Sequence, residues 1–529
     1  MRPEFGGYPY LLSDIVAENE RWVPDETALI FRDRITTWAG FAREMRRIQH
    51  GLARLGVVRG TRVAVLDRNS DTYVILGYAL AGMGAVLVPI NIWLRETEIA
   101  YILANAQPSV LLTSAEFEDC ALAAIADLGD RPRLILSDAR RETALSWDEV
   151  LEAGGDAPLS RPEGWDDPHL VLYTSGTTGR PKGAVISHRR TVLDTMNALP
   201  AFGVRRRDRF FCYMPLFHTG GWDYLKLFFM QRGSAVIAER FDPEAAVVAI
   251  ERHRCNAMFG VPIVLRQMVE SAAWESADMS SMRLIAYANY DPSTLIIDVV
   301  KAFRARGASE LGIANAYGLT EGGCYICINR PEDAMERPLS IGVPVPGVCV
   351  ALLKDDLTHA EAGELGEICV RSPALMSGYL NRPEATAEAF RGGWLHTGDI
   401  GRVDEQGFFH LVDRKKDMIR SGGENVFAKE VELVVVEHPA VSEVAVFGLP
   451  DDDYGERVAA AVVLDGGKAV AEDELKAFVR ARIAGFKTPK QIVFLPELPK
   501  TPAGKIKKHE VKQALLAAPD DDRASPTVG

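Results

Sequence analysis

Residues 169–188 read HLVLYTSGTTGRPKGAVISH, and this stretch decides how the rest of the chain is interpreted. Short apolar runs stand at both ends, VLY before the centre and AVIS after it, and such runs are typical of buried strands. We therefore predict two strands joined by a loop. The loop combines hydroxyl side chains with glycines, namely Ser175, Gly176, Thr177, Thr178, Gly179 and Gly183.

The chemistry of this loop favours an anionic ligand. Glycines let the backbone turn tightly and approach an anion closely, while the hydroxyls and Lys182 add hydrogen-bond donors. Hydrogen bonds to a charged group contribute roughly 1.5–3 kcal/mol each, so a few of them could hold a polyphosphate. The loop is not a Walker A motif, because Pro181 stands where the second glycine of that motif belongs. A glycine-rich hairpin with solvated hydroxyls is the alternative.

Length and composition describe an acidic globular protein. The chain has 529 residues, which predicts two to four lobes, and its 47% hydrophobic and 25% charged residues are ordinary for globular proteins. The formal net charge is −13, from 60 basic and 73 acidic residues. Binding to a nucleic-acid backbone needs a basic face, so we expect no nucleic-acid partner.

Cysteine usage and the N-terminal residues indicate a reducing compartment. The seven cysteines are scattered, and the first residues, MRPEFGGYPYLLSDI, lack the basic-then-apolar pattern of a secretory leader. We therefore expect a cytoplasmic protein with reduced thiols. Cys324 and Cys327 form a C-x-x-C pair with no second pair or histidine at metal spacing, which favours buried structural cysteines over zinc or redox chemistry.

One uncharged stretch is long enough to span a bilayer. Residues 73–94 contain no charged side chain over 22 positions. Gly82 and Gly84 interrupt the middle of the stretch, and Pro89 interrupts its second half. We therefore predict a buried helix, a glycine turn and a buried strand, with no integral membrane association.

The order of helical and strand patterns predicts an α/β fold with two lobes. Helix-period segments alternate with short apolar strands over roughly the first 400 residues, as in layered α/β subdomains. We expect a large N-terminal lobe over residues 1–414 and a small α+β C-terminal lobe over residues 415–517, joined by a hinge. The polar residues 518–529 are expected to form a disordered tail.

Six motifs follow one another in a fixed order. They are YTSGTTGRPKG (173–183), PLFHTGG (215–221), NAYGLTE (315–321), WLHTGD (394–399), DRKKDMIRSGG (413–423) and PKTPAGK (499–505). Together they resemble the signature set of the acyl-adenylate-forming, or AMP-binding, superfamily, and most of all a free-standing acyl-CoA synthetase. The resemblance covers nearly the whole chain, roughly residues 10–515.

The resemblance implies two half-reactions. A carboxylate attacks the α-phosphate of ATP to give acyl-AMP and pyrophosphate, and the thiol of coenzyme A then takes the acyl group. Attack of one anion on another needs cationic and hydrogen-bonding clamps more than a nucleophilic side chain. ATP, Mg²⁺ and coenzyme A are the expected cofactors, and a small carboxylic acid is the expected substrate.

The resemblance also implies roles on the nucleotide side. It assigns residues 175–183 to the β- and γ-phosphates. Tyr317 is expected to stack on adenine, Thr320 to donate to the α-phosphate, and Glu321 to help hold Mg²⁺. A carboxylate beside phosphates suits a hard cation that keeps several waters.

Three further residues complete the large-lobe side of the predicted site. Asp399 and Arg414 match the ribose-binding pair of the family, since a carboxylate can accept hydrogen bonds from two vicinal hydroxyls. His218 in PLFHTGG matches an aromatic gate near the acyl site. The alternatives are a local turn for Asp399 and a satisfied core residue for His218.

The small lobe is expected to supply the moving parts. Lys505 matches the lysine that bridges the carboxylate and the α-phosphate as charge shifts in the transition state. Lys416 matches the hinge between the lobes. Rotation there would withdraw Lys505 and bring Gly422 and Gly423 toward the thiol tunnel, where glycines permit close passage of pantetheine.

One segment departs from the family pattern. The chain reads ANYDP from Ala288, where the family usually has a small-residue G-G-A-P-type segment. The larger side chains of Asn289 and Tyr290 would narrow or redirect the adenine and acyl pockets. Together with Trp222 and Asp223 they suggest an acyl group other than a plain long chain.

Several alternatives stay open from the sequence. A free-standing adenylating enzyme that loads a carrier protein would share the same motifs. A phosphate-loop ATPase or kinase, or a nucleotide-binding regulator without turnover, would share the loop alone. The protein is expected to be a monomer or a homodimer.

Overall fold

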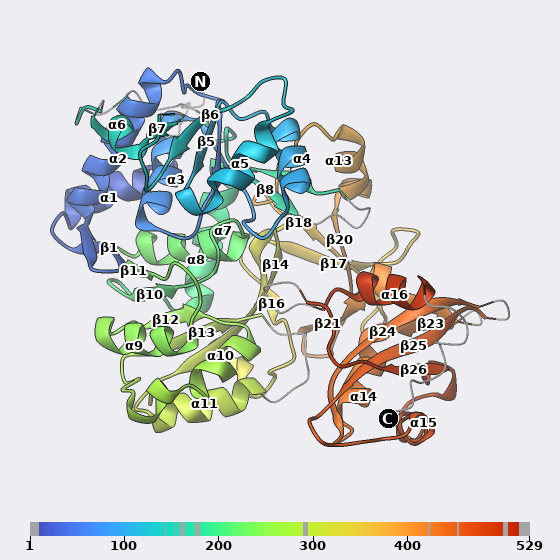
Figure 1. Cartoon of the computed structure of the whole chain (residues 1–529). Coiled ribbons are helices and arrows are strands. Elements are labelled where there is room, and N and C mark those ends of the chain that lie inside the picture. The colour runs from blue at the N-terminus through green and yellow to red at the C-terminus, as the bar shows by residue number, and fades with distance from the viewer. Residues whose placement is uncertain are drawn as a thin grey trace, which may run out of the picture. The chain divides into compact units, whose positions relative to one another are not determined.

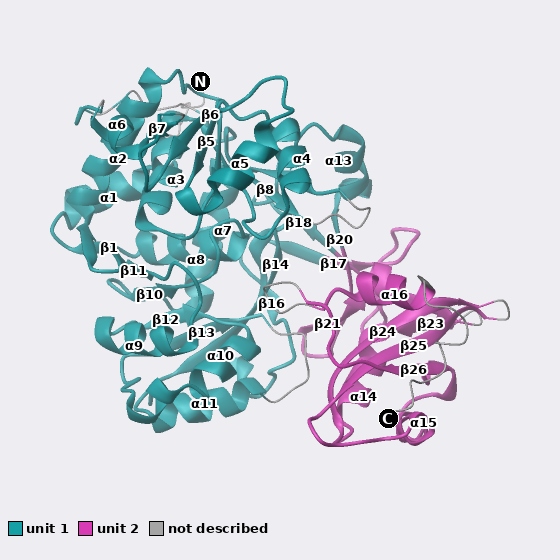
Figure 2. Ribbon diagram, viewed as in Figure 1, with its two compact units in different colours: residues 1–289, 293–350, 369–397 teal, residues 290–292, 351–368, 398–529 magenta. Residues whose placement is uncertain are grey.

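The chain forms two compact units (Figure 2). The first comprises residues 1–289, 293–350 and 369–397, and the second comprises residues 290–292, 351–368 and 398–529. The computed structural model describes residues 10–142, 144–152, 154–157, 159, 164–174, 180–288, 295–421, 424–451, 454–500 and 506–517. The chain passes from one unit to the other within the strands β17 (Cys349–Leu353), β18 (Gly366–Arg371) and β20 (Leu395–Val403).

The larger sheet of the first unit has a parallel centre and antiparallel edges. From β14 to β1 all neighbouring strands are parallel, so helices must connect them. Among the described residues its strand order is β16 (Val343–Pro344), β15 (Gly323–Asn329), β14 (Gly312–Leu319), β13 (Leu284–Tyr287), β12 (Ala257–Phe259), β10 (Arg209–Cys212), β11 (Ser234–Ile237), β1 (Thr27–Phe31) and β2 (Arg34–Thr37).

The second sheet of this unit follows the same plan. Its parallel part runs from β8 to β7, and β9 pairs antiparallel with both β8 and β19. Its order is β19 (Gly378–Tyr379), β9 (Lys182–Ser187), β8 (Pro168–Thr174), β4 (Val86–Pro89), β3 (Arg62–Leu66), β5 (Val110–Thr113), β6 (Arg133–Leu136) and β7 (Leu145–Ser146).

Helices lie beside the strands of this unit (Figure 1), and their apolar side chains are buried in cores shared with the two sheets. One core joins α9, α10 and α11 to strands of the first sheet, and another joins α4 and α5 to strands of the second. The helices of this unit are α1 (Asp14–Trp22), α2 (Trp38–Arg54), α3 (Asp71–Met83), α4 (Glu96–Ala106), α5 (Glu118–Ile125), α6 (Trp147–Glu152), α7 (His188–Phe202), α8 (Thr219–Met230), α9 (Pro243–His253), α10 (Pro262–Val269), α11 (Leu295–Ala305), α12 (Pro331–Ala334) and α13 (Pro383–Ala389).

The uncharged stretch 73–94 folds as predicted. It supplies most of α3, which ends at Gly84 in the left-handed conformation with φ of 69°, and then the fully buried strand β4. A left-handed residue at a helix C-terminus favours glycine, which explains the break in the apolar run. Among the described residues, no helix combines the length and apolar character that crossing a membrane requires.

The second unit contains its own sheet and helices. The strand order is β23 (Glu424–Phe427), β22 (Met418–Ser421), β25 (Gly455–Leu464) and β24 (Val441–Asp451), with β26 (Gln491–Phe494) parallel to β25. Its helices are α14 (Ala428–Val436), α15 (Glu472–Arg480) and α16 (Lys508–Ala517). The antiparallel pair β20 and β21 (Phe409–Arg414) precedes this sheet in the chain.

The predicted α/β fold, with a large N-terminal part and a small α+β C-terminal part, is confirmed. The predicted boundary between residues 414 and 415 stays a prediction, and the predicted tail over residues 518–529 lies outside the described residues. The expectation of two buried cysteines holds for Cys327 alone. Cys324 is the second residue of β15, directly after the buried Gly323, and is itself partly buried.

Candidate active site

The glycine-hydroxyl loop connects two paired strands, as predicted. β8 and β9 are antiparallel, and Thr174 at the end of β8 faces Lys182 at the start of β9. Residues 175–179, with five of the predicted phosphate-binding groups, lie outside the described residues. Gly183 is required by packing, because a Cβ there would lie 2.8 Å from a methyl group of Val171. The two ends of the loop are therefore held at a defined separation by the strand pair.

Glu321 lies beside the same loop. It belongs to the turn between β14 and β15, and its Oε1 accepts hydrogen bonds from the hydroxyls of Thr174 (3.2 Å) and Tyr379 (2.9 Å). The Nζ of Lys182 lies 5.2 Å from the centre of the Tyr379 ring. Burial and the neighbouring Glu321 raise the pKa of the Tyr379 hydroxyl, so it remains a proton donor at neutral pH. Glu321, the predicted metal residue, and Lys182, the predicted phosphate-binding lysine, thus share Tyr379 as a neighbour.

Sequence reasoning missed two residues of this arrangement, Thr174 and Tyr379. Thr174 stands within the YTSGTTG motif, so its hydroxyl could have been included with those of the loop. Tyr379 is 58 positions from Glu321 along the chain, and no local pattern marks it. Only the pairing of β19 with β9 brings its ring to the loop.

Tyr317 and Thr320 occupy one strand and the turn that follows it. Tyr317 lies on β14 opposite Cys327 and is only 1% exposed. Thr320 is partly exposed, directly after the strand. Their predicted contacts with adenine and with the α-phosphate stay predictions.

His218 immediately precedes α8, and its ring lies among aromatic side chains. Its ring centre lies 4.8 Å from that of Phe217 and 6.4 Å from that of Trp93. Burial lowers the pKa of His218 to about 4, so the imidazole is neutral at physiological pH. A neutral ring among aromatic rings is compatible with the predicted gate, which stays a prediction.

The side chains that suggested an unusual acyl group are engaged in packing. Trp222 is buried against α3, where a Cβ on Gly77 would lie 2.3 Å from the indole ring, and its ring meets Tyr73 edge to face. Asp223 is held in a cluster of buried charges. The suggested link between these two residues and the acyl group stays a prediction. Asn289 and Tyr290 lie outside the described residues.

In the second unit, Asp399 and Arg414 form the pair that the sequence predicted. They face each other across β20 and β21, and the guanidinium Nε lies 2.6 Å from the carboxylate of Asp399. Asp399 is 1% exposed, while Arg414 is partly exposed. The pairing of β20 with β21 therefore places the two charges side by side.

The predicted hinge has a short irregular structure. Lys416 is exposed in a single 3₁₀ turn, Lys415–Asp417, between β21 and β22. The neighbouring Lys415 is anchored by Asp355 (2.7 Å) and Glu367 (3.1 Å). Gly422, Gly423 and Lys505 lie outside the described residues, and their predicted roles stay predictions.

Comparison with known proteins identifies the family of this chain. The chain matches the family model of AMP-binding enzymes over residues 16–380 and the model of the AMP-binding enzyme C-terminal domain over residues 430–505. It is similar to a feruloyl-CoA synthase of an Amycolatopsis species, with 37% identity over 93% of this chain and 96% of the relative. It is also similar to a long-chain-fatty-acid–CoA ligase of Mycobacterium tuberculosis, with 34% identity over 88% of this chain and 90% of the relative.

A solved structure shows the same architecture. The crystal structure of the anthranilate CoA ligase AuaEII in complex with anthranoyl-AMP matches with a TM-score of 0.85 and 28% identity, over 96% of this chain and 97% of that one. The fold and the motifs define an adenylate-forming enzyme, and the chain belongs to the AMP-binding enzyme family. Within that family it is an acid–CoA ligase that works through an acyl-AMP, which confirms the predicted class and reaction.

Proposed function

We propose that the enzyme activates a carboxylic acid that carries an aromatic ring. The observation that carries this proposal is the 37% identity to a feruloyl-CoA synthase over nearly the full length of both chains. The structural match to a ligase that binds anthranoyl-AMP supports it. Long-chain fatty acids are the second candidate, favoured by the 34% identity to a fatty-acid ligase.

The acid preference can be measured directly. We expect ferulate or anthranilate to support pyrophosphate release with a kcat/KM at least tenfold higher than that of a saturated sixteen-carbon acid, because even one extra or missing methylene in an apolar pocket changes transition-state binding by about 1–3 kcal/mol. The assay uses a panel of acids with ATP, with and without coenzyme A. A strong preference for unsubstituted long-chain acids would contradict the proposal. Transfer to a carrier protein but not to coenzyme A would contradict the predicted acceptor.

We further propose which residues hold the nucleotide. The donors of the loop 175–179 and Lys182 would clamp the β- and γ-phosphates, and Thr320 would donate to the α-phosphate. Tyr317 would contact adenine, and Asp399 would accept from the ribose hydroxyls with Arg414 beside it. The support is the motif order, the strand pair that frames the loop, and the ion pair between Asp399 and Arg414.

The same proposal assigns the second half-reaction to the C-terminal lobe. Residues 415–517 would rotate about Lys416 after acyl-AMP forms. That rotation would exchange Lys505 for Gly422 and Gly423 at the reacting centre. The exposed 3₁₀ turn at Lys416, between two strands, suits a hinge. We also propose a cytoplasmic location, in keeping with seven free thiols.

Glu321 is the residue we propose for Mg²⁺. Its carboxylate lies beside Thr174 and Tyr379, and one carboxylate together with phosphate oxygens and waters is a donor set that Mg²⁺ accepts. The ion would supply charge neutralisation on the phosphates when bound. The protein itself contributes the position of the carboxylate, which two hydroxyl donors hold.

Replacing Glu321 with glutamine should raise the concentration of Mg²⁺ that the enzyme needs for activity. The amide keeps the shape of the side chain but loses the charge that attracts a cation. We expect the Mg²⁺ concentration at half-maximal pyrophosphate release to rise about tenfold, since one charged contact contributes roughly 1.5–3 kcal/mol. Tyr379→Phe is the control, because it removes one hydrogen bond to Glu321 but retains the charge of that carboxylate. The Mg²⁺ concentration at half-maximal pyrophosphate release should therefore change less than threefold. An unchanged Mg²⁺ dependence in the glutamine variant would contradict the assignment.

A further inference from the structure

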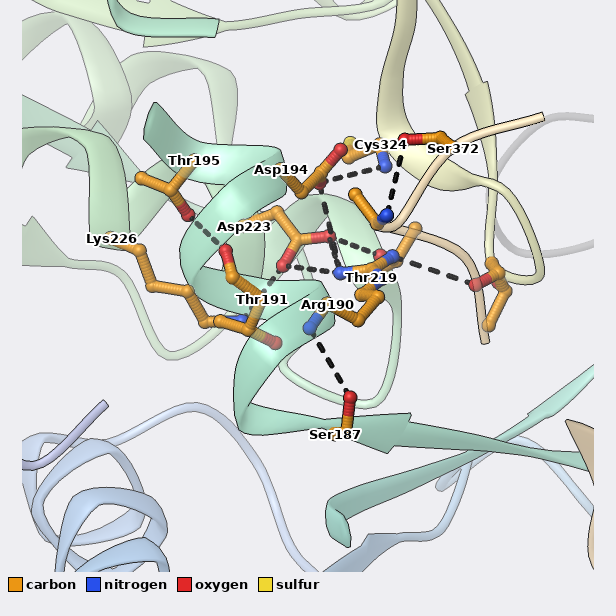
Figure 3. Close-up of polar contacts among 12 residues, drawn as sticks. Ser187, Arg190, Thr191, Asp194, Thr195, Thr219, Asp223, Lys226, Cys324 and Ser372 are labelled. Atoms are coloured by element: carbon orange, nitrogen blue, oxygen red, sulfur yellow. Dashed lines mark hydrogen bonds and ion pairs between the residues drawn. The ribbon is translucent and has the colours of Figure 1, made fainter. Parts of the chain in front are cut away.

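Four charged side chains lie buried together in the first unit, and none belongs to the six motifs (Figure 3). Arg190 and Asp194 lie on α7, and Asp223 and Lys226 lie on α8. None of the four is more than 2% exposed. Charged residues are almost never this buried unless they are paired, and here two cations face two anions. We call these four residues the buried charge cluster.

Asp223 is the centre of the cluster. Its carboxylate accepts hydrogen bonds from the Nη1 of Arg190 (3.1 Å), the Nζ of Lys226 (2.8 Å) and the hydroxyl of Thr219 (2.6 Å). Burial alone would raise the pKa of Asp223, but the two cations hold it below its usual value. Asp194 lies 3.7 Å from Arg190, and burial raises its pKa to about 7 against that attraction.

Stability alone does not explain such a cluster. Removing two charges from water costs several kcal/mol per ion, and apolar residues of similar volume often stabilise a protein as well or better. A charge cluster does provide directed contacts at fixed distances, which an apolar core lacks. Its contacts with neighbouring backbone therefore show what it holds in place.

One set of contacts holds the turn that carries Thr320 and Glu321. Asp194 accepts a hydrogen bond from the backbone N–H of Cys324 at 3.1 Å, just after the turn. The Nη2 of Arg190 lies 3.5 Å from the carbonyl oxygen of Thr320, the outer limit of a hydrogen bond. Gly323 has φ of 98°, and a Cβ there would lie 2.5 Å from Asp194 Oδ1. The carboxylate thus contacts the turn directly.

A second contact holds the start of α8. Thr219 is the first residue of this helix, and its hydroxyl donates to Asp223. His218 immediately precedes it. The cluster therefore contacts both Thr219, which follows the predicted acyl gate His218, and Cys324, which follows the turn with Thr320 and Glu321; Figure 3 shows Thr219 and Cys324 on either side of α7 residues.

We propose that Arg190, Asp194 and Asp223 are positioning residues of the adenylation half-reaction. They hold the turn after Thr320 against the start of α8, so that the groups meeting ATP and the groups meeting the acid keep one relative position. The proposal rests on the role proposed above for Thr320 and on the predicted acyl-gate role of His218. A displacement of about 1 Å at a reacting centre can lower the rate on the order of 10²-fold. Precise positioning of the turn would therefore offset the free energy lost when the four charges are removed from water.

The test removes the part of the cluster that holds the turn. The double variant Arg190→Met/Asp194→Leu deletes one cation and one anion and keeps the Asp223–Lys226 pair. We expect the kcat of acid-dependent ATP–pyrophosphate exchange to fall about 10- to 100-fold, with KM for ATP within threefold and the thermal midpoint unchanged or higher. Arg190→Lys retains the positive charge, but an ammonium cannot contact Asp223 and the carbonyl oxygen of Thr320 at the same time as the guanidinium does. We expect kcat to fall less in this variant, about fivefold.

A matched pair elsewhere in the same unit is the control. The side chains of Arg283 and Asp208 are mostly buried, and the Nη2 of Arg283 lies 2.5 Å from the Oδ1 of Asp208. The double variant Arg283→Met/Asp208→Asn should leave kcat within twofold of the wild-type value. A folded Arg190→Met/Asp194→Leu variant with wild-type kcat would overturn the proposal, as would equal losses in both pairs. If the double variant does not fold, wild-type kcat in Arg190→Lys overturns it instead. Absence of exchange in the wild-type protein with every acid would contradict the proposed function itself.

Discussion

Replacing Lys505 with alanine should lower the rate of acyl-AMP formation by on the order of 10²–10³-fold or more and leave thioester formation from supplied acyl-AMP nearly unchanged. Attack of a carboxylate on the α-phosphate concentrates negative charge, and a preorganised cation stabilises that charge in the transition state. The thioester step begins after pyrophosphate has left and does not need this cation. ATP–pyrophosphate exchange measures the first step, and mixing synthetic acyl-AMP with coenzyme A measures the second.

Lys507 offers a matched control for this experiment. It lies two positions further along the chain, and its Nζ pairs with Glu510 at 2.8 Å on the surface. Exposed ion pairs contribute about 0–1 kcal/mol, so Lys507→Ala should leave both half-reactions within twofold of wild type. An equal loss of both steps in the Lys505 variant would contradict separate roles for the two half-reactions.

Asp399→Asn should lower kcat/KM for ATP about 10- to 100-fold. The substitution keeps the shape of the buried side chain but removes the charge that would accept from the ribose hydroxyls, a loss of roughly 1.5–3 kcal/mol. It also leaves Arg414, at 2.6 Å, without its carboxylate partner. Loss of ion pairing alone would lower the rate with every nucleotide to the same extent.

Deoxynucleotides separate ribose binding from ion pairing. The wild-type enzyme should lose about tenfold in kcat/KM with 2′-deoxy- or 3′-deoxy-ATP, whereas the Asp399→Asn variant should lose less than threefold, because the missing hydroxyl no longer has an anionic partner. Asp404→Asn is the control, since Asp404 accepts from Phe408 N (2.9 Å) in the turn of the same hairpin and should not affect nucleotide use. Equal discrimination by wild type and Asp399→Asn would contradict ribose binding.

Patterns of local sequence predicted most of the fold. The apolar runs on either side of the glycine-hydroxyl loop are paired strands, and the uncharged stretch 73–94 breaks at Gly84 because that residue has a positive φ. Such features depend on residues that are adjacent in the sequence, so they can be predicted without a structure. The depth of burial at Cys324 depends on the turn beside it, which is why this cysteine is only partly buried while Cys327 is fully buried.

The site was predictable where a residue stands in a family motif, and not where distant segments meet. Asp399 and Arg414 stand in two such motifs and face each other across β20 and β21, while their role at the ribose stays a prediction. Arg190 stands in HRRTVLD, which has the composition of an exposed helix start, yet it is 1% exposed because Asp223 on another helix neutralises it. Tyr379 reaches Glu321 only through the pairing of distant strands. Contacts of this kind follow from tertiary structure and leave no spacing in the sequence.

The proposed reaction requires residues from separate motifs to hold one nucleotide. A crystal structure of the protein with ATP and Mg²⁺ tests this most directly. We predict the triphosphate at the loop 175–179, adenine against Tyr317, and the ribose hydroxyls within hydrogen-bonding distance of Asp399. Nucleotide bound anywhere else, with these residues making no contact to it, would contradict the account.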